Sequence, residues 1–404
     1  LRVEIDGAPV DLAFASIDDF HPDRLAARLA SIERTAAMTA EPSSPSPAPS
    51  GGIGPAPDLT RAVSGASLLD DILDDVGAPQ PRRADELSAF VDRVVAPHLV
   101  QAPDRDAAAR AESKQQETAR VLRRILHHPR VQALESTWRA IELLVRRLDT
   151  DGELHLFIFD VPREQIAIGL ERLASQRQAA EAESWSLAIS LHAFPDGDAG
   201  AECLARVAMA ARTLSTPLVA AAPVSFAGRA SATALEDDGQ PAAPPEVYTL
   251  IRRSLEARFL GLTIPRVLLR VPYGRDNPCD TIDFEELDDP AAHDDYLWGS
   301  GASLVALLAG EAFNERGWAI GGRMSLDVSS LPFYTYRRGT ETVAAPCAET
   351  LMSERGARHL LSRGLMPLAW IKNTDRVRLV ELRSVADPAA PLAASWAGST
   401  GSTA

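Results

Sequence analysis

The chain has 404 residues, of which 46% are hydrophobic, and a formal net charge of −15. This length can bury one large or two medium-sized domains, and the acidic balance argues against binding to nucleic acid. No apolar run approaches the ~18–20 residues that span a bilayer, and no signal peptide pattern is present, so we expect no membrane span. Cys203, Cys279 and Cys347 lie far apart, fitting neither a zinc knuckle nor a disulfide framework. Their pattern predicts a cytoplasmic protein, and we expect no metal or cofactor.

The first residues predict a small folded segment followed by a linker. "LRVEIDGAPVDLAF" contains two strand-like runs around an Asp-Gly turn, and Pro22 marks the start of a helix. Residues 39–63 are rich in Pro, Ser, Gly and Ala and predict a disordered linker. "SLLDDILDD" (67–75) predicts a short helix with one apolar face, formed by Leu68, Leu69, Ile72 and Leu73. The chain begins at Leu1 rather than methionine, which predicts that its natural start lies upstream.

A longer helical region covers about residues 84–149, broken at "HHPR". Pro129 ends one helix and begins the next. In the second helix a stripe spaced four and three residues apart predicts the packing face: Leu134, Trp138, Ile141, Val145 and Leu148. His127 and His128 are adjacent and cannot chelate one metal ion from a helix without outside ligands. Their position favours a role at the helix ends.

Strands alternate with helices after residue 150. "LHLFIFDV" (154–161) and "SLAISLHAF" (186–194) predict strands, and residues 201–223, 245–274 and 296–320 each predict a helix running into a strand. This alternation predicts an α/β fold with helices flanking the sheet. Residues 385–404 predict a flexible tail.

The sequence contains no GxxxxGK[ST], GxSxG, HExxH or CxxC motif, and "AIGGRM" predicts a turn. Two segments could carry chemistry. In "DFEELDDPAAHDDYLWG" a divalent metal could bind Glu285, Glu286, His293, Asp294 and Asp295. The acidic composition favours instead a solvated loop that leads into a helix. In "WIKNTDR" Lys372 could act as a base, although Asn-Thr-Asp after an apolar run favours a turn. We therefore predict that the protein is not an enzyme.

Several spaced segments together resemble one family. "ILHHPRVQALESTWRAIELLV", "ARFLGLTIPRVLLRVPYG", "FEEL…YLWGS" and "LMPLAWIKNTD" occur in the order found in the large subunit (TssC/VipB) of the contractile sheath of bacterial type VI secretion systems. The matching motif residues are Trp138, Pro265, Pro272, Trp298, Lys372, Asn373 and Asp375. The resemblance implies a sheath-subunit-like core at 64–384, a mixed sheet with flanking helices, preceded by a helical N-terminal region. Residues 1–38 separately resemble the C-terminal end of the small sheath subunit (TssB/VipA).

This resemblance implies a structural subunit of the sheath. Its expected partners are other sheath subunits, the inner tube, the baseplate and a ClpV-type unfoldase, which in the family recognises the helix that 67–75 resembles. Two features depart from the family: Ser300 replaces the usual asparagine, and the chain ends soon after "KNTD", where family members continue. The second departure keeps an alternative open. In it, the protein is a sheath-like accessory or regulatory adaptor that binds sheath, baseplate or unfoldase without polymerising.

Overall fold

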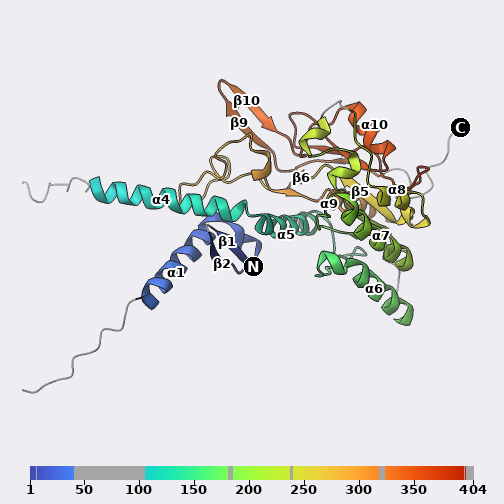
Figure 1. Ribbon diagram of the computed structural model, residues 1–404, viewed down its shortest axis with the longest axis horizontal. Coiled ribbons are helices and arrows are strands. Elements are labelled where there is room, and N and C mark those ends of the chain that lie inside the picture. Colours follow the sequence, from blue (N-terminus) through green and yellow to red (C-terminus); the bar gives the residue numbers. More distant parts are fainter. Residues whose placement is uncertain are drawn as a thin grey trace, which may run out of the picture. The chain divides into compact units, whose positions relative to one another are not determined.

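The computed structural model describes residues 1–5, 7–40, 105–180, 185–236, 240–317, 324–394 and 396 (Figure 1). The chain divides into two units, one formed by Leu1–Leu29 with Glu117–Ala404 and the other by Ala30–Gln116. The described part of the second unit consists of portions of α1 (Pro22–Ala40) and α4 (Arg105–Leu126). The predicted helix at 67–75 and nearly all of the predicted linker at 39–63 lie outside the described residues. The features that follow belong to the first unit.

A six-stranded mixed sheet forms the centre of this unit, which confirms the predicted α/β class. Its order is β3-β4-β5-β11-β12-β8, comprising Ala188–Ile189, Leu218–Ala221, Leu260–Ile264, Met366–Trp370, Val377–Leu379 and Asp327–Val328. The first four strands are parallel, and β12 and β8 pair antiparallel. Three two-stranded antiparallel pairs complete the strands: β1 (Arg2–Ile5) with β2 (Ala8–Asp11), β6 (Val267–Leu268) with β7 (Trp298–Gly299), and β9 (Tyr334–Arg338) with β10 (Glu341–Ala345).

Successive side chains of each strand point to opposite faces of the sheet, so both faces are apolar and both are covered by helices. Leu260 and Leu262 of β5 point into a core formed with α6 (Ile166–Ala180), α7 (Gly197–Leu214), α8 (Glu246–Arg252) and α10 (Glu354–Ser362). Val219 of β4 and Leu368 of β11 point into a second core formed with α5 (Pro129–Arg147) and α9 (Ala302–Arg316). The predicted helix-to-strand order at 201–223 and 245–274 is confirmed by α7–β4 and α8–β5.

The N-terminal segment packs on the core through a third apolar cluster. Its hairpin, the turn Ile17–Phe20 and the start of α1 lie against the end of α4 and the start of α5 (Figure 1). The buried members are Val3, Ile5, Leu12, Phe20, Leu25, Leu122, Ile125, Leu126, Val131, Tyr273 and Phe284. The sequence predicts both the hairpin and the helix start at Pro22 but gives no sign of where they dock.

Two predicted segments differ from the structure. Residues 154–161 form no strand, although Phe157 contacts Trp185 and the Val161 carbonyl accepts a hydrogen bond from His192, on either side of β3. The described part of the predicted tail is packed: Val385, Leu392 and Trp396 are buried, and the Trp396 Nε1 donates to the Ser186 carbonyl at 2.9 Å. Scattered large apolar residues anchor this segment, so the tail prediction is wrong for residues 385–394 and 396.

Candidate functional site

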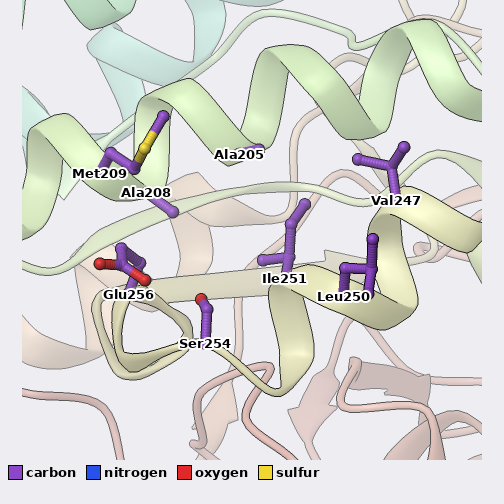
Figure 2. A pocket seen from close by; sticks show the side chains of 8 residues that line it. All are labelled: Ala205, Ala208, Met209, Val247, Leu250, Ile251, Ser254 and Glu256. Carbon is purple, nitrogen blue, oxygen red and sulfur yellow. The ribbon is translucent and has the colours of Figure 1, made fainter.

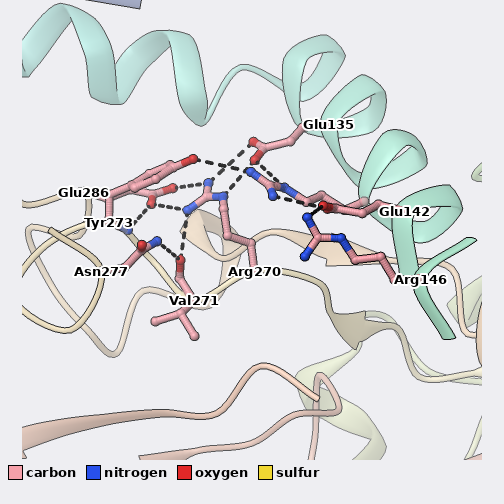
Figure 3. Close-up of polar contacts among 9 residues, drawn as sticks. Glu135, Glu142, Arg146, Arg270, Val271, Tyr273, Asn277 and Glu286 are labelled. Carbon is pink, nitrogen blue, oxygen red and sulfur yellow. Dashed lines mark hydrogen bonds and ion pairs between the residues drawn. The ribbon is translucent and has the colours of Figure 1, made fainter. Parts of the chain in front are cut away.

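A deeply buried ion network is centred on Arg270 (Figure 3). Its guanidinium donates to Glu135 of α5 at 2.8 Å and to the two carboxylate oxygens of Glu286 at 2.6 and 2.9 Å. The side chains of Arg270, Glu135 and Glu286 are 6%, 0% and 2% exposed. Arg270 lies two residues after β6, and Glu286 lies in the loop before β7. The network therefore joins α5 to two segments that are distant from it in sequence.

Neighbouring groups complete the network and balance its charge. The guanidinium lies 4.2 Å from the centre of the Tyr273 ring, and the Tyr273 backbone N–H donates to Glu286. Arg139 donates to Glu135 at 3.4 Å. Burial alone lowers the pKa of Arg270, but the charges of Glu135 and Glu286 outweigh it and hold that pKa well above its usual value. Burial also raises the pKa of Tyr273, to about 12.

This arrangement is suited to holding elements together rather than to catalysis. Both buried carboxylates accept hydrogen bonds from a guanidinium that does not lose its proton. Both are therefore engaged in joining α5 to the segments around β6 and before β7. Removing one member of a buried ion network leaves an uncompensated charge in the interior, which is strongly destabilising. The network therefore holds its elements in a fixed arrangement.

The buried face of α5 coincides only in part with the predicted stripe. Its buried residues are Val131, Glu135, Ser136, Ala140 and Leu144. On the predicted stripe Val145 is 56% exposed and Trp138 is half-buried. Leu148 is buried, and Leu134 and Trp138 pack against an apolar cluster, so the stripe is confirmed in part. Apolar spacing misses Glu135, a charged residue within the buried face. The breakpoint itself is confirmed: Pro129 begins α5, and His128 Nδ1 caps it by accepting from the Arg130 N–H.

The acidic segment 283–299 does not assemble the metal site considered from sequence. Glu286 is committed to Arg270, whereas His293 Nδ1 lies 3.1 Å from Asp294 and its Nε2 lies 3.4 Å from Glu349. His127 stands between Asp295, 3.3 Å away, and Glu286, 3.9 Å away. The favoured interpretation, a solvated loop, is also wrong for Glu286, which is buried because it pairs with a cation on another element.

The remaining motif residues are distributed over the core rather than gathered at one point. Pro265 and Pro272 are buried on either side of β6, and Trp298 of β7 is buried and donates from Nε1 to the His293 carbonyl at 2.8 Å. Lys372 and Asn373 are exposed in the predicted turn, which joins β11 to β12. There Asp375 accepts from the Ser330 N–H at 3.1 Å. Leu68, Leu69, Ile72 and Leu73 lie outside the described residues.

An apolar segment beside the sheet edge is left uncovered. Leu156, Phe157, Ile158 and Phe159 are consecutive and exposed, with Phe157 and Ile158 at 62% and 68%. Phe157 meets the Trp185 ring edge-on at 4.8 Å, and the Val161 carbonyl accepts from His192, so the segment runs alongside β3. Among the described residues, none donates a backbone hydrogen bond to residues 156–160. A run of exposed apolar side chains to which the described residues donate no backbone hydrogen bond is suited to pairing with another strand.

A second apolar surface lies between α7 and α8 (Figure 2). A shallow pocket of about 240 Å³ is lined by Ala205, Ala208, Met209, Val247, Leu250, Ile251, Ser254 and Glu256. Met209 and Leu250 are exposed at its rim, and Glu256 is held at one end by Arg212 at 2.6 Å. Small alanines below large flexible side chains allow close approach of a partner element. In the part of the chain that the structure describes, no helix is long and apolar enough to cross a membrane.

The Arg270 network holds elements of the α/β domain together. The two exposed apolar surfaces are suited to contacts with other proteins. Residues 113–386 match the family described as EvpB/VC_A0108, tail sheath N-terminal domain, and the chain belongs to this VipB family. It is similar to the type VI secretion system sheath protein TssC1 of Pseudomonas aeruginosa, with 26% identity over 293 residues. That alignment covers 66% of this chain and 58% of the relative, so the chain spans little more than half of the relative's length.

Proposed function

We propose that the protein is a non-enzymatic, cytoplasmic structural subunit of the contractile sheath of a type VI secretion system. Its work is mechanical: subunits join by strand pairing and helix packing, and the lattice contracts as a whole. Other sheath subunits are its direct partners, and the inner tube and baseplate adjoin the assembled sheath. The observation that carries the proposal is the uncovered segment 156–159. Membership of the sheath family supports its interpretation as a contact between assembled subunits.

The docking of the N-terminal segment supports a two-part organisation. We propose that residues 1–38 correspond to the end of a small sheath subunit and 64–384 to a large-subunit core. Residues 1–29 bury a hairpin and Phe20 against the core. The Asp23 carboxylate accepts from the Thr281 hydroxyl and from the backbone N–H groups of Asp280 and Thr281. Burial raises the pKa of Asp23, but these hydrogen bonds outweigh it and hold the pKa below 3.8.

Electron microscopy of the full-length protein mixed with its cognate sheath partners tests this assignment. We expect tubular assemblies that incorporate the protein, and we expect Ile158→Asp to abolish incorporation because the charge would be buried in the new contact. Val145→Asp places the same charge at an exposed position of α5 and serves as the matched control.

Binding to preformed sheath, baseplate or unfoldase without entry into tubes would contradict the sheath assignment and favour the adaptor. Incorporation of the Ile158→Asp variant at the wild-type level would show that segment 156–159 is not the contact.

We further propose that residues 67–75 are recognised by a ClpV-type unfoldase. A helix of about two turns is too short to be stable alone in water, and an apolar face of this kind binds in a partner's groove. A peptide spanning residues 64–78 is expected to bind the N-terminal domain of the cognate unfoldase. Replacing Leu69 and Ile72 with aspartate should abolish that binding in a titration, whereas an unchanged affinity would refute the proposed contact.

A further inference from the structure

Three side chains that bind transition metals gather where the N-terminal segment meets the core. His21 and Asp23 flank the start of α1, and Cys279 lies in the loop between β6 and β7. One potential ligand atom from each lies within 4.8 Å of the other two. All three residues are half-buried, so the place is reachable by an ion yet sheltered from bulk water. The spacing of the three cysteines in the sequence gives no hint of this cluster because its other members are some 250 residues away.

We propose that His21, Asp23 and Cys279 bind one Zn²⁺ ion, with water as the fourth ligand. A set of imidazole, carboxylate and thiolate suits zinc, whereas Mg²⁺ and Ca²⁺ select oxygen ligands alone. The site would fasten residues 1–29 to the core, a role independent of sheath assembly.

The geometry of two ligands is close to that of a tetrahedral site. His21 Nδ1 lies 3.5 Å from Asp23 Oδ2, and zinc bonds of about 2 Å at the tetrahedral angle place such atoms about 3.4 Å apart. The cysteine sulfur, within 4.8 Å of the other two ligand atoms, completes the site by moving inward by at most about 1.3 Å, given a Zn–S bond of about 2.3 Å.

The surrounding contacts hold the ligands in position. Asp23 is fixed by Asp280 and Thr281, the two residues that follow Cys279. The His21 ring packs edge-on against Tyr273 at 4.9 Å. Its Nδ1 accepts a hydrogen bond of 3.3 Å from the Asp23 N–H and faces the Asp23 carboxylate. Zinc replaces that long hydrogen bond with a coordinate bond.

The cysteine requires the metal in order to ionise. Burial, followed by the charges of Asp23 and Glu286, raises the pKa of Cys279 to about 11, so the free side chain is a thiol at neutral pH. On binding, the S–H bond breaks, the proton passes to solvent and the sulfur lone pair forms the Zn–S bond.

Calorimetric titration of the full-length, metal-free protein with zinc chloride tests the site. We expect one ion per chain, and a loss of affinity of at least about 100-fold in Cys279→Ser and in His21→Ala, since even removal of an outer contact to a ligand costs about 10–100-fold. Cys203→Ser removes a half-buried thiol on α7 and should leave the affinity unchanged.

Titration of the wild-type protein with cobalt(II) provides a readout that does not depend on a variant folding. We expect a thiolate-to-cobalt charge-transfer band together with the intense visible bands of a tetrahedral ion. The absence of stoichiometric zinc binding, an equal affinity in Cys279→Ser, or a cobalt spectrum without thiolate ligation would each overturn the proposal.

Discussion

Replacing Arg270 with methionine is expected to lower the free energy of unfolding by about 3–5 kcal/mol. The substitution leaves Glu135 and Glu286, 0% and 2% exposed, in the interior without the cation that balances them. Methionine retains most of the side-chain volume, so the loss arises mainly from uncompensated charge rather than from a cavity. Urea denaturation followed by circular dichroism measures the change.

Arg378→Met is the matched control. Arg378 forms an equally short pair with Asp327, through two hydrogen bonds of 2.6 Å, but its side chain is 57% exposed. Water replaces the lost partner at such a position, so the unfolding midpoint should hardly move. Similar midpoints for the two variants would show that the Arg270 network is solvated in solution.

Replacing Phe20 with alanine is expected to cost about 3–5 kcal/mol and to release the N-terminal segment. Phe20 is fully buried and stacks on Phe14 with ring centres 4.2 Å apart. It belongs to the cluster that joins residues 1–29 to α4, α5 and the loop before β7. The cavity would remove the apolar centre of that contact. Urea denaturation gives the cost, and limited proteolysis followed by mass spectrometry detects new cleavage within residues 1–29.

Phe333→Ala removes the same side chain at a position that is 37% exposed, outside this cluster. It should cost less and leave the N-terminal cleavage pattern unchanged. If Phe20→Ala behaved like Phe333→Ala, the apolar cluster would not be what retains the segment.

The sequence predicts local structure well where local interactions determine it. The Asp-Gly turn predicts the hairpin β1–β2, Pro22 and Pro129 begin helices as expected, and the turn at Asn373 adopts the left-handed backbone at φ 61° that asparagine tolerates. The helix-to-strand units at 201–223 and 245–274 follow from apolar runs long enough to exclude other structures. The strand prediction for residues 154–161 is wrong because a strand also requires a partner strand, which an apolar sequence alone does not supply.

The candidate site is far harder to predict because it depends on pairs distant in sequence. Arg270 in "VLLRV" is a local signal, since a cation inside a buried apolar run requires a buried partner. Nothing local identifies that partner as Glu135, which lies 135 residues away on a helix whose predicted apolar stripe omits it. The metal-binding cluster has the same property: His21 and Asp23 resemble an ordinary helix start until the fold brings Cys279 to them.

The docking of residues 1–29 also fixes the order in which the polypeptide acquires its structure during synthesis. The hydrogen-bond partners of Asp23 are Asp280 and Thr281, 257 and 258 residues further on. At about 5–20 residues per second, a ribosome needs roughly 13–50 s to produce them after Asp23 has been made. Residues 1–29 thus leave the ribosome well before the residues on which they dock, and until then the apolar side of the hairpin is open to chaperones.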